Sequence, residues 1–277
     1  MTPASNQDAL APELVAELRE VAETAALEAA ELVREHAAGP VTVAETKSSK
    51  VDVVTAADRA SEELLSQRVM EMRPRDGFFG EEGGRRESRT GVTWVVDPID
   101  GTVNFLYGIP HYSVSVAAVD QDDISLAGAV VNVPSGELFT AARGQGATLD
   151  GAPLAVRPVP PMSERLVITG FQYQARIRAL QGAAVAQLLR HVRDIRREGS
   201  AALDLCQVAS GRADTYVEEG LHLWDRAAAS LVAAEAGARV SLHRGVGGMT
   251  CVLCVPADGY DDMLALVARC GFFEASS

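Results

Sequence analysis

The stretch Trp94-Val95-Val96-Asp97-Pro98-Ile99-Asp100-Gly101-Thr102 carries more chemical information than any other part of the chain. Its apolar start predicts a strand that ends at Asp97, and Pro98 then turns the chain because proline fixes φ and lacks an N–H donor. Asp100 lies on this turn, so two carboxylates three residues apart can converge with backbone carbonyls between them. An all-oxygen cluster suits a hard cation such as Mg²⁺. Gly101 and Thr102 can open the next helix, whose free N–H groups would bind a phosphate oxygen.

Two further acidic motifs lie at the ends of predicted elements. Glu81 and Glu82 stand between two glycines after a β-like run, and Asp225 follows Trp224 at the start of an alanine-rich helix. Phosphate esters are chemically inert, and two metal ions about 3.5–4 Å apart can activate water and neutralise the leaving oxygen. Three acidic motifs are what such a site requires.

Each acidic motif also has an ordinary structural interpretation. Asp-Gly is a common turn, and an acidic residue before a helix is usually a cap. Asp58 shows the ambiguity, because Thr55-Ala56-Ala57-Asp58 resembles a capping box and Asp58 can still point toward a metal ion. The five histidines lack the spacing of metal ligands, which argues against a histidine-rich metal centre.

Composition narrows the classes of partner. The 277-residue chain has 47% hydrophobic residues, as globular proteins do, and a formal net charge of −13. A surface this acidic repels nucleic acid and anionic lipids, so neither is an expected partner. Bound metal ions would supply the positive charge that a phosphate needs. The chain shows no signal-peptide pattern and no apolar segment long enough to span a bilayer, which predicts a cytoplasmic protein.

The spacing of apolar residues predicts helices beside a sheet in residues 1–155. Helices are expected over residues 12–38 and from Thr55 to just before Pro74. β-like runs follow at 78–79, 93–96, 113–119, 126–133 and 137–142. We predict an α+β half with an antiparallel sheet that bears the metal-binding motifs.

The pattern changes after a proline-rich stretch, and residues 156–277 read as an α/β half. Strands and helices alternate from a strand at 166–169 to a last helix over 260–270, which is typical of βαβ units. This half would complete the site, so that both halves form one compact unit.

The four cysteines are predicted to be structural. Cys251 and Cys254 form a C-x-x-C, which can indicate a redox or zinc site. They lie in an apolar run, however, where residues three apart on a strand point to opposite faces. No second C-x-x-C is present to complete a zinc site. We expect buried, free thiols.

Five motifs, in order and at matching spacings, resemble the inositol monophosphatase family, in particular its bacterial SuhB-type members. The resemblance runs from Lys47 to Gly237. Its motifs lie at residues 52–58, 80–82, 97–105, 199–206 and 224–225. It implies a layered α-β-α-β-α sandwich of the inositol monophosphatase/fructose-1,6-bisphosphatase type, with the site between the halves. Homodimers and inhibition by lithium are also implied.

The resemblance assigns metal ligands, with Mg²⁺ as cofactor at two or three ions per site. Glu81, Asp97 and the backbone carbonyl of Ile99 match the ligands of the first ion. Asp97, Asp100 and Asp225 match those of the second ion.

It also assigns residues to catalysis and to substrate binding. Glu82 and Asp58 match outer or third-metal carboxylates. Thr102, hydrogen-bonded to Asp58, matches a residue proposed to help deprotonate the attacking water. The resemblance assigns Thr102, Asp58 and Glu81 to catalysis. Residues that would contact phosphate or substrate are Gly101, Thr102, Asp100, Gly199, Ala201, Glu218 and Asp225. Of these, Glu218 matches a carboxylate that reads polyol hydroxyls.

The function implied is Mg²⁺-dependent hydrolysis of a phosphomonoester. Inositol 1-phosphate is the first choice of substrate, attacked in line by a metal-activated water to give myo-inositol and phosphate. Phosphatases for histidinol phosphate, fructose 1,6-bisphosphate and 3′-phosphoadenosine nucleotides share this metal core and remain alternatives. A non-enzyme alternative is a partner of the transcription machinery, a role that some bacterial relatives have.

Overall fold

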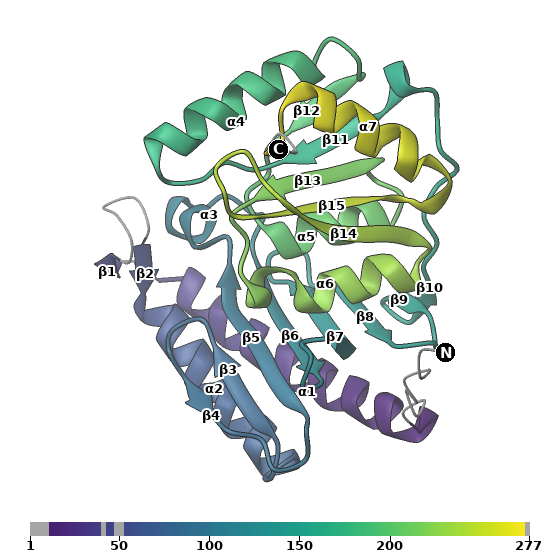
Figure 1. Ribbon diagram of the computed structural model, residues 1–277. Coiled ribbons are helices and arrows are strands. Elements are labelled where there is room, and N and C mark those ends of the chain that lie inside the picture. The colour runs from purple at the N-terminus through teal and green to yellow at the C-terminus, as the bar shows by residue number, and fades with distance from the viewer. Residues whose placement is uncertain (1–10, 40–42, 47–52, 275–277) are drawn as a thin grey trace.

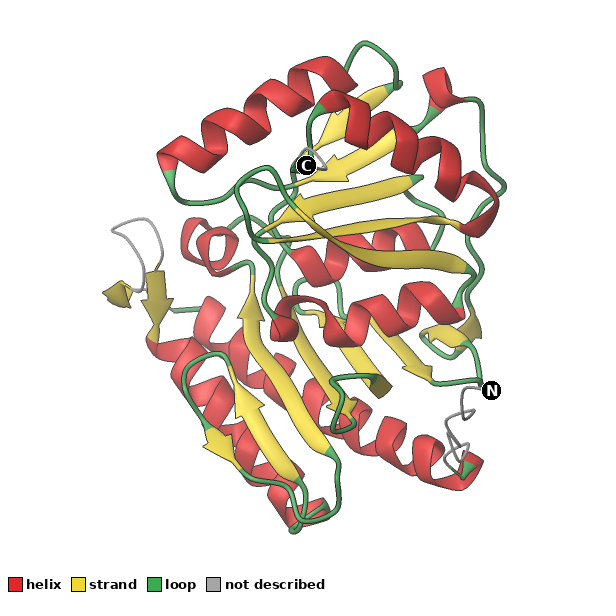
Figure 2. Cartoon of the chain, viewed as in Figure 1, coloured by secondary structure: helices red, strands yellow, loops and turns green. Residues whose placement is uncertain are grey.

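Two large β-sheets alternate with layers of helices (Figures 1 and 2). The computed structural model describes residues 11–39, 43–46 and 53–274. Residues 47–52, which include the start of the first family motif, lie outside this described part. Within it, no helix combines the length and the apolar character that crossing a membrane requires.

The helices and strands have the following bounds. The helices are α1 (Pro12–Ala37), α2 (Ala56–Met72), α3 (Thr102–Tyr107), α4 (Ala175–Leu188), α5 (Ala201–Ala209), α6 (Leu223–Glu235) and α7 (Tyr260–Cys270). The eight-stranded sheet has the order β10 (Ala152–Pro153), β9 (Ala147–Leu149), β8 (Leu138–Ala142), β7 (Ser125–Asn132), β6 (Ser113–Val119), β5 (Thr93–Asp100), β3 (Gly77–Gly80) and β4 (Arg85–Arg86). The five-stranded sheet has the order β12 (Asp194–Arg196), β11 (Leu166–Thr169), β13 (Thr215–Glu219), β15 (Thr250–Pro256) and β14 (Ala238–Arg244). A small separate pair consists of β1 (Val43–Thr46) and β2 (Val53–Thr55).

Three hydrophobic clusters fill the spaces between the layers. The first lies between helices α1 and α2 and one face of the eight-stranded sheet. The second surrounds α5 and α6, which lie between the two sheets. The third lies under α4 and α7, on the outer face of the five-stranded sheet. This order of layers is the predicted α-β-α-β-α sandwich.

Small side chains bring the middle helices close to the sheet. Gly128 of β7 faces Ala228 of α6, and a Cβ on Gly128 would lie only 2.8 Å from the Cα of Ala228. Any larger residue at position 128 would push α6 outward. Because Asp225 is on the first turn of the same helix, this close packing also fixes the position of a predicted metal ligand.

The first sheet departs from the prediction in one pairing. Its strands are antiparallel except for β3 and β5, which run parallel from Gly77↔Thr93 to Gly80↔Val96. The chain leaves β3 through an antiparallel turn into β4 and then returns along a loop to the start of β5. That extra reversal gives β5 the direction of β3, so both strands end at the same edge, where Glu81 and Asp97 lie.

The cysteines confirm the structural interpretation. Cys206, Cys251, Cys254 and Cys270 are all buried and free. On β15, Cys254 faces the middle helices, whereas Cys251 faces the outer cluster under α7. Their side chains therefore lie on opposite faces of the sheet, and they cannot share a metal ion or a disulfide.

Candidate active site

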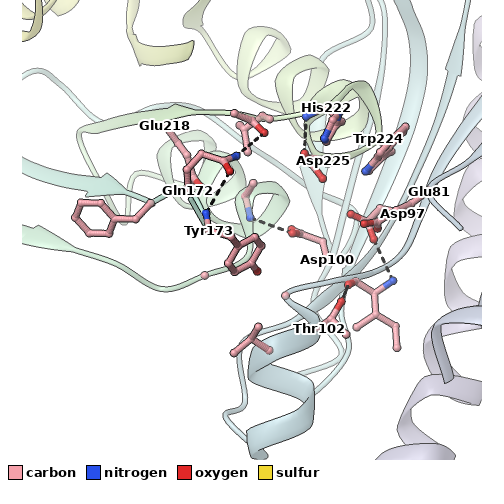
Figure 3. Close-up of a pocket in the computed structure, with 18 of the residues that line it drawn as sticks. Glu81, Asp97, Asp100, Thr102, Gln172, Tyr173, Glu218, His222, Trp224 and Asp225 are labelled. Atoms are coloured by element: carbon pink, nitrogen blue, oxygen red, sulfur yellow. Dashed lines mark hydrogen bonds between the residues drawn. The ribbon is translucent and has the colours of Figure 1, made fainter. Parts of the chain in front are cut away.

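A polar cavity of about 260 Å³ lies where the end of β5, the starts of α3, α5 and α6, and the end of β13 meet (Figure 3). It is lined by ten predicted residues: Glu81, Asp97, Ile99, Asp100, Gly101, Thr102, Gly199, Ala201, Glu218 and Asp225. The two remaining predicted residues, Asp58 and Glu82, lie outside its lining. Both halves of the chain contribute walls.

A β-bulge at the end of β5 turns both aspartates toward the cavity. On a regular strand, residues three apart point to opposite faces. Here Asp97 pairs with Ser115 and Asp100 with Ser113, so β5 has one residue more than β6 between the two pairs. The Ile99 N–H donates to Asp97 Oδ1 over 3.1 Å and holds the bulge. Pro98 fits this position because it needs no donor.

The start of α5 holds the second aspartate. Ser200 Oγ and the Ala202 N–H donate to Asp100 Oδ2 over 2.6 and 2.7 Å, and the Ala201 N–H donates to Oδ1 over 3.2 Å. A carboxylate is favoured at a helix N-terminus by the free N–H groups there. These hydrogen bonds lower the pKa of Asp100, although burial raises it more.

Four carboxylates repel one another across the cavity (Figure 3). Burial raises the pKa of Asp97 well above its usual value, and the charge of Glu81 and of the two other aspartates raises it further. The pKa of Asp225 is raised by burial and by the charges of Glu81 and Asp100. Among the described lining residues, Arg197 is the only arginine or lysine. An all-oxygen set of buried and half-buried, mutually repelling carboxylates fits divalent cations such as Mg²⁺.

Gly101 forms the turn between β5 and α3. Its φ of +96° is in the left-handed region that favours glycine. A Cβ there would also lie 3.2 Å from the carbonyl oxygens of Gly199 and His111. The turn directs the start of α3, at Thr102, into the cavity.

Thr102 and Asp58 are joined as the resemblance implied. The Thr102 hydroxyl lies 3.2 Å from Asp58 Oδ1 and 3.0 Å from the Ile99 carbonyl oxygen, so its proton has two acceptors. Asp58 Oδ2 accepts from the Thr55 N–H over 2.7 Å and from the Thr55 hydroxyl, and a capping box begins α2. The cap interpretation of Asp58 is confirmed, and its Oδ1 contacts Thr102 of the cavity lining, while its role toward a metal ion stays a prediction.

Helix α2 gives the site a support that was not predicted from the sequence. Glu62, buried, accepts hydrogen bonds from the Glu82 and Gly84 N–H groups over 2.7 and 2.8 Å. Ser61 Oγ donates to the Pro98 carbonyl over 3.1 Å. A signal for this support was present, because Asp58, Ser61 and Glu62 share a helix face with buried Leu65. Polar residues on such a face need partners.

On α6, Asp225 accepts a hydrogen bond from the His222 N–H over 2.6 Å and so caps its own helix while it faces the cavity. Trp224 fixes this first turn. Its ring packs edge-on against Phe79, with centroids 5.2 Å apart, and His222 stacks on it at 4.7 Å. The cap is confirmed, and the ligand interpretation of Asp225 stays a prediction that its place in the cavity lining allows.

The wall away from Glu81, Asp97, Asp100 and Asp225 contains residues that no sequence motif singled out. Gln172 and Tyr173 follow β11, and Gln172 Nε2 donates to the Gly220 carbonyl over 3.1 Å (Figure 3). Beside them lies the predicted Glu218, which accepts from the Tyr216 hydroxyl over 2.9 Å, and burial raises its pKa to about 7. The sequence offered one signal for Gln172 and Tyr173, the alternation of strands and helices in this half. Such alternation predicts parallel strands, and the carboxyl ends of the parallel neighbours β11 and β13 do meet at one edge of the sheet.

Comparisons with known proteins agree with this geometry. The sequence profile of the inositol monophosphatase family matches residues 14–260. Inositol-1-monophosphatase SuhB of Mycobacterium tuberculosis is 44% identical over 274 residues, covering 92% of this chain and 94% of the relative. Nus factor SuhB of Pasteurella multocida is 41% identical over 197 residues, covering 70% and 73%. The solved structure of Mycobacterium tuberculosis SuhB superposes with a TM-score of 0.81 at 42% identity, covering 94% of this chain and 98% of that one. This chain belongs to the inositol monophosphatase family.

Proposed function

We propose that this chain hydrolyses inositol 1-phosphate to myo-inositol and phosphate with Mg²⁺ as cofactor. Family membership makes it a phosphoric monoester hydrolase. The observation that carries the proposal is the convergence of Glu81, Asp97, Asp100 and Asp225 on one cavity beside the start of α3.

The proposed roles follow from where each group lies. Glu81, Asp97 and the Ile99 carbonyl would hold one magnesium ion, and Asp97, Asp100 and Asp225 a second. Bound Mg²⁺ supplies a Lewis acid that lowers the pKa of water and neutralises developing charge. In this proposal, Asp97 contributes to both ions, so it is the residue that the site can least replace.

The chain's own groups would position phosphate and proton. Gly101 and Thr102 line the cavity, and their backbone N–H groups would bind phosphate oxygens. Thr102 Oγ1 would accept the water proton while passing its own proton to Asp58 Oδ1, 3.2 Å away. Glu82, whose charge helps to raise the pKa of Asp58, would bind a third ion with it.

The opposite wall favours a polyol. Glu218 and Gln172 offer carboxylate and amide groups for hydroxyls, and Gly199 also lines the cavity. The Ala201 N–H already donates to Asp100. If Ala201 also contacts the substrate through this N–H, the N–H would be shared between Asp100 and the substrate. Histidinol phosphate, fructose 1,6-bisphosphate and 3′-phosphoadenosine nucleotides are the alternative substrates on this metal core.

Phosphate release from these four substrate types, with and without Mg²⁺ and Li⁺, tests the proposal. Inositol 1-phosphate should give the highest kcat/KM, Mg²⁺ should be required, and Li⁺ should inhibit. Asp97→Asn should abolish turnover, whereas Asp122→Asn, which removes the same charge from an exposed turn, should not. Near-normal turnover by Asp97→Asn would refute the metal assignment. A higher kcat/KM for histidinol phosphate than for inositol 1-phosphate would make histidinol phosphate the substrate.

The Nus factor relatives support a second candidate role, as a partner of the transcription machinery. Capture of transcription proteins by the inactive Asp97→Asn chain, equal to capture by the wild type, would support it. We also propose a homodimer in the cytoplasm that binds no nucleic acid or membrane directly, in keeping with the net charge of −13. Light scattering would show a mass of one chain if the dimer proposal is wrong.

A further inference from the structure

His111, Glu198 and Asp204 form a second cluster of potential metal ligands, outside the lining of the active-site cavity. His111 Nε2 lies 3.3 Å from Asp204 Oδ1 and 3.4 Å from Glu198 Oε2. One ligand atom from each of the three residues lies within 4.8 Å of the others. The residues come from the loop after α3, the turn before α5, and α5 itself.

These separations are long for hydrogen bonds. Charge-assisted N–H···O bonds are about 2.7–2.9 Å long, and the single Nε2–H cannot point along both contacts. The His111–Asp204 contact is a long hydrogen bond, and both printed separations also fit the edges of a metal coordination shell. Bonds of about 2.0–2.2 Å from zinc to nitrogen and oxygen, arranged tetrahedrally, place ligand atoms about 3.3–3.6 Å apart.

Asp204 supplies an independent observation. The residue is completely buried, and its Oδ2 has no hydrogen-bond partner among the described residues. A buried carboxylate without full compensation is costly. Metal ligands must be deprotonated, and in that state two carboxylates beside a neutral imidazole carry a charge of about −2, which a divalent cation balances. Glu198 is already oriented, because Gln207 Nε2 donates to its Oε2 over 2.7 Å, as outer partners of metal ligands do.

We propose that His111, Glu198 and Asp204 bind one divalent transition-metal ion of the zinc class, separate from the catalytic magnesium ions. The imidazole ligand selects against Mg²⁺, which prefers oxygen. The remaining coordination position would be filled by water, since the side chains of His111 and Glu198 are partly exposed.

The ion would brace the junction between the two halves of the chain. Asn104 Nδ2 already donates to the carbonyl oxygens of both His111 and Glu198, each over 2.7 Å. A metal ion would join the side chains of the same two segments. The second segment leads directly into α5, whose first N–H groups hold Asp100.

Zinc titration of the full chain against a chromophoric chelator tests the proposal. The proposed magnesium site is first disabled by Asp97→Asn and Asp225→Asn, which gives the cage-disabled chain, and excess Mg²⁺ is present throughout. We expect one zinc ion per chain. His111→Asn should weaken zinc binding by more than about tenfold, whereas His191→Asn, at an exposed histidine, should leave it unchanged. Zinc should also raise the Tm of the cage-disabled chain, but not that of its His111→Asn form.

Cobalt(II) gives a second readout that is independent of activity. Four-coordinate cobalt with a nitrogen ligand absorbs strongly in the visible range, and this band should disappear in His111→Asn. If His111→Asn fails to fold, Glu198→Gln at the partly exposed ligand replaces it. Absence of a zinc ion in the cage-disabled chain, or unchanged binding by the folded variants, would show that His111 is only ion-paired. Loss of zinc with His222→Asn would place the ion at the cavity and also refute the proposal.

Discussion

The Thr102 hydroxyl joins the cavity to the helix beneath it, because its one proton has the Asp58 carboxylate and the Ile99 carbonyl as acceptors. If this hydroxyl transfers the water proton, Thr102→Val should lower kcat by about 10²-fold or more, the usual contribution of a positioned acid or base. KM should change little, because the backbone N–H groups that are proposed to bind phosphate remain. Steady-state kinetics checks this, and Thr102→Ser should recover most of the rate. A Thr102→Val enzyme with normal kcat would remove Thr102 from the mechanism.

Gly101 is constrained by its conformation and by its neighbours together. Gly101→Ala places a Cβ at a φ of +96° and 3.2 Å from two carbonyl oxygens. Gly108, at the end of α3, has a φ of +68°, but an added methyl group there would meet nothing within 4 Å. Urea unfolding should show a loss of about 1–2 kcal/mol for Gly108→Ala, from the backbone alone, and a larger loss for Gly101→Ala. Equal losses would mean that the close contacts are relieved without cost.

At the level of elements, α2 supports three parts of the site with one buried polar face. Asp58 contacts Thr102, Ser61 contacts the Pro98 carbonyl, and Glu62 holds the turn that carries Glu82. Glu62→Gln keeps the shape but puts an N–H₂ group where an acceptor is needed. We expect the Mg²⁺ concentration for half-maximal activity to rise about 10–100-fold, as for other outer partners of metal ligands. Glu63→Gln, on the exposed face of the same helix, is the control and should leave the magnesium dependence unchanged.

The elements also show what the sequence could predict. The helices and most strands were predictable because apolar spacing and caps are local, as at Pro12, the Thr55 capping box and β11. The parallel pairing of β3 with β5 depends on the path of the intervening chain, which no local pattern records. Glu81, Asp97, Asp100 and Asp225 were found through their motifs, and Glu218 only through the family resemblance. Gln172 and the His111 cluster were not found, because their partners lie far along the chain. Glu62 had a local signal, a polar side chain on a buried helix face, but that signal does not identify its partners.

For the whole molecule, the fold stability should depend on pH through carboxylates that are buried together. Burial raises the pKa of Asp204 from 3.8 to about 7 and that of Glu218 from 4.5 to about 7. The pKa values of Asp97 and Asp225 are raised well above their usual range by burial and mutual repulsion. A group with a raised pKa in the fold binds more protons there than in the unfolded chain between the two pKa values. Stability then falls as pH rises through that window.

The metal-free chain should therefore be more stable near pH 5 than near pH 8. Mg²⁺ should reverse this trend at pH 8, because it binds the ionised carboxylates of the fold and not the unfolded chain. Thermal unfolding at both pH values, in a chelator and in excess Mg²⁺, measures the effect. Asp97→Asn should reduce both the loss at pH 8 and the recovery with Mg²⁺, since it removes one of the repelling charges and a proposed ligand. A metal-free Tm that rises from pH 5 to pH 8 would show that these carboxylates do not form one cluster that needs a bound cation.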